Sequence, residues 1–467
     1  METFSAVVTT GIYCRPGCPA RPHPDNVRPY TTAAAAEAAG FRACLRCRPY
    51  RSPHTVGWSG PELVCRAVRL VVDGALDDAN EAVLGARVGV SGRNLRRLFQ
   101  THLGVTPDGL ARSRRAHFAR RLLDDTDMAV TDVAFAAGFG SVRQLHRACR
   151  EVFRAAPTEL RRRRRAADRL SADGGLRLRL PFRGPLAWDS LLAYFAARAI
   201  PGVEQVDGRT YRRTIVVDAD PGVLELAPGD EPDHLVVRAH LPHWAGLIHV
   251  VERARGIAGL DVDLGAATAH LAGEPVIAPL VAVRPGLRVP GTWDPFETGV
   301  RAIVGQQVSV AAATTMTGRI ARRHGTPVPG LGPLGLSHTF PAPEVLADAD
   351  LGGLGLVPAR AKAVKAFAAA VAAGKVRLDG SVSLEGFVAS VTELPGLGPW
   401  TAHYLALRMG EPDAFPATDL GLRRALARHA PDVSDPLPEL AERWRPWRAL
   451  AATHLWAGAG PESRGGT

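Results

Sequence analysis

Two close pairs of cysteines stand near the N-terminus, in the patterns Cys14-x3-Cys18 and Cys44-x2-Cys47. Two such pairs can supply four thiolates in a tetrahedron around one zinc ion, with each sulfur about 2.3 Å from the metal. The first ten residues lack a basic region followed by an apolar run, so we expect a cytosolic protein, in which this spacing favours metal binding over disulfides. Two alternatives stay open at this point: reduced pairs of buried cysteines, and a purely structural zinc finger.

The residues around the four cysteines resemble the N-terminal domain of the Ada family of adaptive-response proteins. The similar stretches are TTGIYCRPGCPAR (Thr9 to Arg21) and GFRACLRCRP (Gly40 to Pro49). The resemblance implies one zinc ion per chain held by the four cysteines, with Cys14 accepting a methyl group from a DNA methylphosphotriester and Arg21 contacting a phosphate. Zinc would keep the acceptor thiol deprotonated and nucleophilic. Methylation would remove a negative charge and thereby raise the affinity for DNA.

A second candidate site combines a glycine-rich hairpin with a carboxylate. In LPGLGPWTAHYLALR, Gly396 and Gly398 expose backbone N–H groups at a helix start, which binds a phosphate without sequence preference. Asp419 stands nineteen residues after Trp400. A carboxylate in a dry site stabilises the oxocarbenium charge that develops on deoxyribose when an N-glycosidic bond is hydrolysed. The competing interpretations are an aspartate that only caps a helix and a hairpin that only clamps DNA.

A hairpin followed by an aspartate at this distance resembles the helix-hairpin-helix DNA glycosylase superfamily, and the wider chain resembles its AlkA-type 3-methyladenine branch. The resemblance extends from Leu176 to Gly460. It implies that Asp419 is the catalytic carboxylate and that Gln307 enters the base stack once the target nucleotide is flipped out of the duplex. Its further matching pieces are LAYFAARAI, RAIVGQQVS and WRPWRALAATHLW, which begin at Leu192, Arg301 and Trp444.

An N-alkylated purine is cationic, so electron-rich rings can select it by cation–π attraction worth about 0.5–2 kcal/mol per ring. Bifunctional members of the superfamily carry a lysine at the hairpin position of Trp400, whereas the three lysines of this chain lie elsewhere. We therefore expect a monofunctional glycosylase that leaves an intact abasic site. No C-terminal cysteine cluster is present, so we expect no iron–sulfur cluster. The candidate rings of the base pocket are Trp400, Tyr404, Trp456, Tyr194 and Trp293.

Between the two candidate sites lies a basic helical stretch with an internal repeat. HLGVTPDGL (His102 to Leu110) recurs as VFRAAPTEL (Val152 to Leu160), fifty residues later. Upstream of each copy come a short helix, a turn glycine and a serine that can cap the next helix, namely Gly89 with Ser91 and Gly138 with Ser141.

This repeat resembles the AraC-type DNA-binding domain, in which a long helix, here residues 108 to 123, joins two helix-turn-helix units. The helix after each serine would enter a major groove. The alternative is a helical bundle with a solvated basic face. The basic side chains that we expect to contact DNA are Arg93, Arg96, Arg143 and Arg147.

Composition divides the chain into residues 1–55, 61–165, 176–289 and 290–460, with a linker at residues 166–175. These segments predict a multidomain, mainly α-helical protein. In chain order we expect a small zinc-binding α+β domain, an all-α double helix-turn-helix domain, an α+β AlkA-type N-terminal subdomain and an all-α helix-hairpin-helix glycosylase domain.

The net charge of +11 suits a polyanionic partner, although arginine usage of this kind also arises in GC-rich genomes. The sequence contains no stretch of 18 or more uncharged apolar residues, so we expect no transmembrane helix. We expect a bacterial cytoplasmic, nucleoid-associated monomer. Its expected partners are double-stranded DNA, both alkylated and at promoters, and RNA polymerase.

Together these patterns predict a DNA alkylation repair protein that also regulates transcription. It would excise alkylated bases as a DNA-3-methyladenine glycosylase and would accept methyl groups on a zinc-bound cysteine. The alternative function is a transcription regulator whose C-terminal half only senses damaged DNA. Asp419 discriminates between the two, because a sensor does not require a carboxylate at that position.

Overall fold

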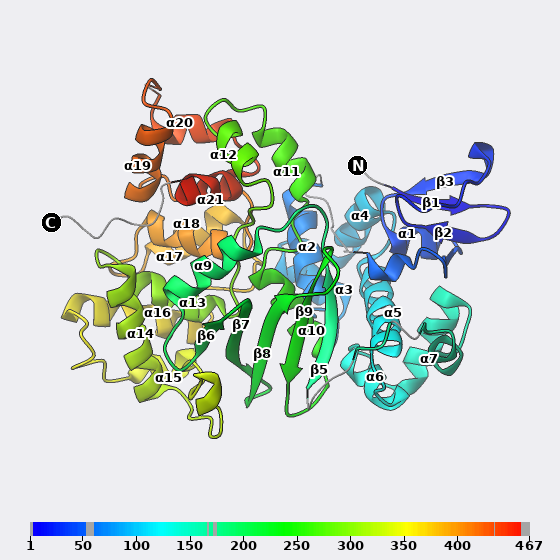
Figure 1. The fold of residues 1–467 in the computed structure, drawn as a ribbon, viewed down its shortest axis with the longest axis horizontal. Coiled ribbons are helices and arrows are strands. Elements are labelled where there is room, and N and C mark those ends of the chain that lie inside the picture. The colour runs from blue at the N-terminus through cyan, green and yellow to red at the C-terminus, as the bar shows by residue number, and fades with distance from the viewer. Residues whose placement is uncertain (1–2, 53–59, 166–167, 171–174, 434, 459–467) are drawn as a thin grey trace. The chain divides into compact units, whose positions relative to one another are not determined.

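The computed structural model describes residues 3–52, 60–165, 168–170, 175–433 and 435–458. The chain divides into two compact units, the first made of residues 1–182 with 234–253 and the second of residues 183–233 with 254–467 (Figure 1). Within the described ranges, no helix has both the length and the apolar character needed to cross a bilayer.

The first unit begins with a small α+β layer. Its strands form a sheet in the order β3-β1-β2-β4, in which β2 and β4 run parallel and the other neighbours antiparallel. β2 ends at Cys14, and Cys44 directly follows β4. Because the two strands run parallel, both cysteine pairs lie at the C-terminal ends of these strands. The elements are β1 (Phe4–Val7), β2 (Ile12–Cys14), β3 (Val27–Tyr30), α1 (Ala33–Ala38) and β4 (Arg42–Ala43).

The helical part of the first unit confirms the repeat. Gly89 and Gly138 adopt φ values of +84° and +77°, which glycine reaches without a steric cost. The hydroxyl of Ser91 accepts the N–H of Asn94 at 3.2 Å, and Ser141 caps the corresponding helix of the second copy. The helices are α2 (Glu62–Val72), α3 (Glu81–Arg87), α4 (Gly92–Leu103), α5 (Pro107–Asp125), α6 (Val130–Ala136), α7 (Val142–Phe153) and α8 (Pro157–Arg162).

Strands β5 (Leu176–Pro181) and β9 (His234–His240) pair antiparallel, and helix α10 (Leu247–Ile257) follows them. Of the predicted linker, residues 166–167 and 171–174 lie outside the described residues. Asp168 is buried, and its carboxylate lies 2.7 Å from the guanidinium of Arg48. This part of the predicted linker is therefore packed against the first unit.

The second unit contains an antiparallel meander of β6, β7 and β8 together with the remaining helices. Its elements are α9 (Trp188–Arg198), β6 (Glu204–Asp207), β7 (Thr210–Val217), β8 (Asp220–Pro228), α11 (Leu264–Leu271), α12 (Ala278–Val283), α13 (Pro295–Val304), α14 (Val310–His324), α15 (Pro343–Asp348), α16 (Pro358–Ala372), α17 (Leu384–Thr392), α18 (Pro399–Arg408), α19 (Leu420–His429), α20 (Leu437–Glu442) and α21 (Arg448–Gly458).

Helix α13 lies at the centre of the second unit and packs against α14, α16 and α18 (Figure 1). Phe296 of α13 stacks on Phe367 of α16, with ring centroids 5.7 Å apart. Gly299 lets these helices approach closely, because a Cβ there would lie 2.4 Å from the ring of Phe367.

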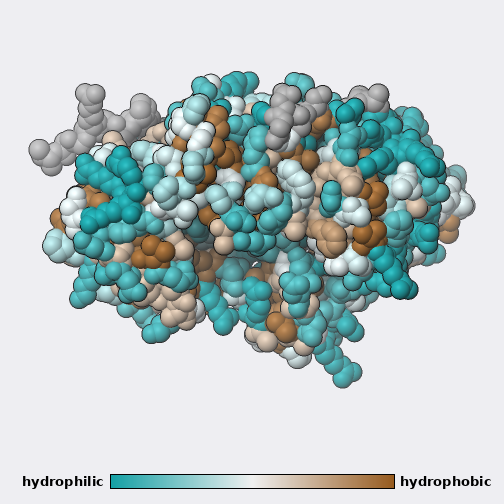
Figure 2. All heavy atoms as spheres, turned by 90° about the horizontal axis from the view of Figure 1, so that it is seen from below, coloured by the Kyte–Doolittle hydropathy of each residue, from teal (hydrophilic) through white to brown (hydrophobic). Residues whose placement is uncertain are grey.

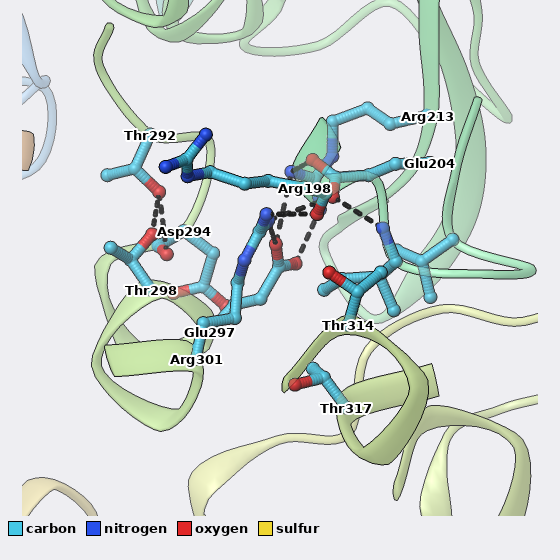
Figure 3. A network of polar contacts seen from close by, with 12 residues as sticks. Arg198, Glu204, Arg213, Thr292, Asp294, Glu297, Thr298, Arg301, Thr314 and Thr317 are labelled. Carbon is cyan, nitrogen blue, oxygen red and sulfur yellow. Dashed lines mark hydrogen bonds and ion pairs between the residues drawn. The ribbon is translucent and has the colours of Figure 1, made fainter. Parts of the chain in front are cut away.

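A buried network of charges fixes α13 to the meander (Figure 3). Arg213 of β7 donates to both carboxylate oxygens of Glu297, at 2.5 and 3.4 Å. Arg301, one turn further along α13, lies 2.8 Å from Glu204 of β6 and 3.3 Å from Glu297. Arg301 also donates to the carbonyl of Arg198 at the end of α9. The charges of two arginines and two glutamates thus neutralise one another inside the second unit.

The face in Figure 2 is mostly hydrophilic, and its hydrophobic side chains lie in small separate groups. Single exposed apolar residues are normal on protein surfaces. One of the exposed large hydrophobic residues is Leu420, 63% exposed at the first position of α19.

Candidate active site and metal centre

Asp419 lies at the N-cap of α19, where one of its oxygens accepts the backbone N–H of Leu422 at 2.8 Å. It also receives two indole donors. Nε1 of Trp400 donates to Oδ2 at 2.8 Å, and Nε1 of Trp456 donates to Oδ1 at 3.0 Å. The aspartate is therefore a helix cap, and its carboxylate is at the same time held in a fixed orientation among aromatic rings.

The rings beside this carboxylate form a cluster drawn from α18 and α21. Trp400 and Tyr404 stack with an interplanar angle of 8° and centroids 5.3 Å apart. Tyr404 also meets Trp456 edge to face at 6.2 Å. A base sandwiched between two rings requires about 7 Å between them. The stacked pair thus leaves no space for a base between Trp400 and Tyr404.

Arg408 organises the far end of Tyr404. Its guanidinium donates to the hydroxyl of Tyr194 from α9, to the hydroxyl of Tyr404 at 3.2 Å and to the carbonyl of Gly291 at 2.7 Å. The two tyrosine hydroxyls lie 3.0 Å apart. Burial alone raises the pKa of Tyr404, but the positive charges of Arg408 and Arg198 outweigh it and bring that pKa to about 8. Burial raises the pKa of Tyr194 to about 12.

His403 of α18 supports the loop that leads to Asp419. Its Nδ1 accepts the backbone N–H of Phe415 at 3.3 Å. Burial and the nearby positive charge of Arg448 lower the pKa of His403, which favours the neutral, accepting form. The loop between α18 and α19 is therefore tied to the hairpin helix that carries Trp400.

The hairpin joins α17 to α18. Gly396 has a φ of +79°. Gly398 is the N-cap of α18, and a Cβ placed on it would have no atom within 4 Å. Next to it lies the loop between α13 and α14, where Gln307 is exposed and adopts a φ of +56°. The amide of Gln306 donates to the carbonyl of Gly396 at 3.2 Å and joins the two segments.

The four cysteines of the first unit converge on one point. One ligand atom of each lies within 4.8 Å of the others, as in a tetrahedron of sulfurs around zinc, whose edges are about 3.8 Å. Hydrogen bonding from Cys14 lowers the pKa of Cys47 to about 5 and raises that of Cys14. The thiolate is the form of cysteine that binds zinc. Four sulfur donors in this arrangement fit zinc.

This metal centre is packed onto the connecting helix α5. Tyr13, which precedes Cys14, is completely buried and donates to the carboxylate of Glu37 at 2.5 Å. Nε2 of His117 on α5 lies 2.6 Å from the same oxygen of Glu37. The ring of His117 in turn lies 5.9 Å from that of Phe153, at the end of α7.

The segment after Cys47 makes a second connection to α5. Tyr50 donates to Asp124 at 2.9 Å, and Arg51 donates to Asp125 at 2.8 Å. The ring of Tyr50 also meets Phe153 edge to face at 5.8 Å. Asp124 and Asp125 are buried, so these contacts compensate carboxylates inside the first unit.

The predicted DNA-contacting arginines lie on the two helices that follow the capping serines. Arg93 and Arg96 are exposed on α4, and Arg143 and Arg147 are exposed on α7. Arg96 also pairs with Glu81 at 2.7 Å. Arg21, predicted beside the metal centre, is exposed as well.

Four family models match consecutive parts of the chain. They are described as metal binding domain of Ada (residues 2–50), helix-turn-helix domain (84–163), AlkA N-terminal domain (177–294) and HhH-GPD superfamily base excision DNA repair protein (300–448). A probable bifunctional transcriptional activator/DNA repair enzyme AlkA from Mycobacterium tuberculosis H37Rv is 41% identical over 97% of this chain and 92% of its own length. The chain belongs to this bifunctional AlkA family.

Two further similarities concern the C-terminal part of this bifunctional AlkA protein. DNA-3-methyladenine glycosylase 2 of Escherichia coli K12 is 34% identical and is covered over 95% of its length, which corresponds to 59% of this chain. A solved 3-methyladenine DNA-glycosylase from Archaeoglobus fulgidus superposes with a TM-score of 0.52 at 22% identity, covering 60% of this chain and 97% of that one. The second likeness shows a common fold. The predicted fold class and family resemblances are thus confirmed.

The structure brings four of the five predicted base-pocket rings of this AlkA-family chain together with Asp419 in one cluster. Trp400, Tyr404, Trp456 and Tyr194 lie in one cluster with Asp419. Trp293 is buried directly before α13. Arg408, Gln306 and the network of Figure 3 were not predicted from the sequence. Arg408 and Gln306 both stand inside stretches quoted for the resemblance, so their position in those stretches was the available signal.

Proposed function

We propose that the C-terminal half hydrolyses the N-glycosidic bond of alkylated bases with Asp419 as its catalytic carboxylate, and that it is a monofunctional DNA-3-methyladenine glycosylase. The observation that carries this proposal is the carboxylate itself, fixed by two indole N–H donors beside stacked rings. A protein that only sensed damage would not need a charge held at this point. Release of free 3-methyladenine from methylated duplex DNA tests the proposal against the sensor alternative.

In the proposed reaction the bond between C1′ and the base nitrogen breaks, and its electron pair leaves with the cationic base, which becomes neutral. Asp419 stabilises the oxocarbenium charge on the sugar. Water then forms the new C1′–O bond and loses a proton to the carboxylate or to solvent. Trp400 stands where a Schiff-base lysine would be needed to cleave the strand, so the product is an intact abasic site.

Base selection is assigned to the aromatic cluster. Because Trp400 and Tyr404 contact each other, the flipped base stacks on an outer face of this pair. Arg408 donates to the hydroxyl of Tyr404 and thereby fixes the orientation of that ring in the cluster. Tyr194 supports this arrangement from α9, and the role of Trp293 stays a prediction.

Binding of DNA is assigned to two surfaces. In the second unit, the backbone N–H groups at Gly396 and Gly398 bind a phosphate, and Gln307 fills the vacated stack. In the first unit, α4 and α7 present Arg93, Arg96, Arg143 and Arg147 to promoter DNA. Further parts of the proposal are a monomeric, nucleoid-associated cytoplasmic protein, contact with RNA polymerase, and the domain limits 1–55, 61–165, 176–289 and 290–460.

The N-terminal site is proposed to hold one zinc ion and to accept a methyl group on Cys14. The thiolate would attack the methyl carbon of a phosphotriester, the C–O bond would break, and an anionic phosphodiester would leave. Exposure does not single out Cys14, which is only 6% exposed, so this assignment rests on the family resemblance. Arg21 would hold a neighbouring phosphate.

Zinc content is the first measurable consequence. Purified protein is expected to hold about one equivalent of zinc, because the four sulfurs converge on one point. The variant Cys18→Ser should lose the metal, whereas Cys65→Ala, which changes a buried cysteine outside the cluster, should retain it. Metal analysis showing less than about half an equivalent, unrestored by added zinc, contradicts the assignment.

Methyl transfer is the second consequence. After incubation with DNA that carries methylphosphotriesters, intact mass should rise by one methyl group, and peptide mapping should locate it on Cys14. The Cys14→Ser variant should gain no methyl group. A methyl group found on Cys18, Cys44 or Cys47 would show that the acceptor is misassigned, and unmodified protein would show that the transfer does not occur.

A further inference from the structure

The loop between α13 and α14 contains an unusual backbone conformation at an exposed side chain. Gln307 has a φ of +56°, a left-handed conformation that is unfavourable for a residue other than glycine. Such a conformation persists where surrounding contacts determine it, and it occurs often at functional positions. The residue before it, Gln306, is half-buried and contacts neighbouring segments.

The side chain of Gln306 is held by the phosphate-binding hairpin. Its amide nitrogen donates to the carbonyl of Gly396 at 3.2 Å and to the hydroxyl of Thr401 at 3.1 Å. Gly396 lies in the turn of the hairpin, and Thr401 is a buried residue of α18. The side chain of Gln306 thus spans from the loop to both the turn and the helix of the hairpin.

The backbone of Gln306 is held from a third element. The guanidinium of Arg360, in the first turn of α16, donates to the carbonyl oxygen of Gln306. Helix α16 also contacts the hairpin, since a Cβ on Gly396 would lie 3.4 Å from that of Ala363. Side chain and carbonyl of Gln306 are therefore both fixed, and the peptide that leads to Gln307 has little freedom to turn.

We propose that Gln306 and Arg360 are positioning residues that hold Gln307 at a fixed distance from the phosphate-binding hairpin. The hairpin and Gln307 then act as one rigid element, so gripping the backbone sets the point at which the base stack is entered. The loop is already ordered in the free protein, so insertion of Gln307 into a duplex does not carry the entropic cost of ordering it. This inference rests on the proposed role of Gln307.

Insertion of Gln307 can affect excision only in duplex DNA, where the flipped base leaves a gap in the base stack. Comparison of duplex with single-stranded DNA therefore tests the proposal. We compare single-turnover excision of the same alkylated base from duplex and from single-stranded DNA, for wild type, Gln306→Glu and Arg360→Met. Gln306→Glu keeps the shape but replaces the donor by an acceptor facing the Gly396 carbonyl. Both variants should lose about tenfold on the duplex and little on the single strand, because only the duplex requires a base to be unstacked.

Two controls accompany this comparison. Arg360→Lys retains a cationic donor and should recover part of the duplex rate. Arg322→Met removes an exposed positive charge from α14 and should change both substrates equally little. Fluorescence of 2-aminopurine beside the lesion reports the flipping step directly, and its rise should be slowed in Gln306→Glu and Arg360→Met but not in Arg322→Met.

Gln307→Ala separates the failure of this inference from failure of the proposed function. If both residues act through Gln307, Gln306→Glu should cost nothing further when added to Gln307→Ala. A duplex rate unchanged in Gln307→Ala would overturn the insertion role and this inference with it. A slow Gln307→Ala beside normal Gln306→Glu and Arg360→Met would overturn the positioning alone, and so would equal losses on duplex and single strand.

Discussion

Asp419→Asn is expected to slow base release about 100- to 1,000-fold while binding to damaged DNA survives. The substitution removes the charge that faces the developing oxocarbenium ion, and loss of one such preorganised contact costs about 3–4 kcal/mol. Asparagine caps a helix as well as aspartate does, so α19 should persist. Binding depends on the hairpin amides and the aromatic cluster, which the substitution leaves in place. Single-turnover excision measured beside a binding titration gives both quantities.

The indole donors determine the controls for this variant. The amide group of an asparagine would face the N–H of either Trp400 or Trp456 and leave it without its acceptor, at about 1 kcal/mol. Trp400→Phe removes the donor to Oδ2 but keeps a ring on Tyr404, so it should slow excision far less than Asp419→Asn. Asp435→Asn changes an exposed carboxylate and should leave excision intact. Near-normal excision by Asp419→Asn would show that this half is not an enzyme of the proposed type.

Arg213→Met is expected to lower the free energy of unfolding by about 3–5 kcal/mol. The variant leaves Glu297, which is 1% exposed, without the guanidinium that binds both of its oxygens. Methionine fills part of the volume but cannot neutralise a buried carboxylate. Burial already raises the pKa of Glu297, and loss of Arg213 should raise it further. Denaturant unfolding followed by tryptophan fluorescence measures the change.

The preceding residue on the same strand supplies a matched control. Arg212 pairs with Glu225 at 3.4 Å, in a more exposed setting than that of Arg213. Arg212→Met should therefore cost less than Arg213→Met, because the carboxylate of Glu225 keeps some access to water. Equal effects of the two substitutions would mean that the network of Figure 3 does not hold α13 to the meander.

The sequence allowed the prediction of features that depend on neighbours along the chain. The turn glycines and capping serines of the repeat are of this kind, because φ and capping are local properties. The convergence of four cysteines followed from their spacing together with the family resemblance. The aromatic cluster was predicted as a set of rings. The structure joins four of the five proposed rings in one cluster, and two of them, Trp400 and Trp456, donate to Asp419.

The features that were missed depend on pairings over long distances in sequence. Arg213 and Glu297 are 84 residues apart, and neither has a pattern around it that distinguishes a buried ion pair from a surface charge. Likewise, nothing in the sequence shows that the amide of Gln306 reaches the hairpin, 90 residues away. The contacts of Tyr13 and Tyr50 with α5 could not be predicted either, because they depend on how two segments fold against each other.

That packing has a consequence for how the chain can be dissected. A cut near residue 60, between the segments matched by the first two family models, falls where sequence similarity changes but not where packing ends. A fragment beginning at α2 would uncover Phe153 and His117 and would deprive Asp125 of Arg51. The metal-binding segment is therefore part of the scaffold of the helix-turn-helix pair. Recombination at this boundary would have to preserve the contacts that the metal-binding segment makes with α5.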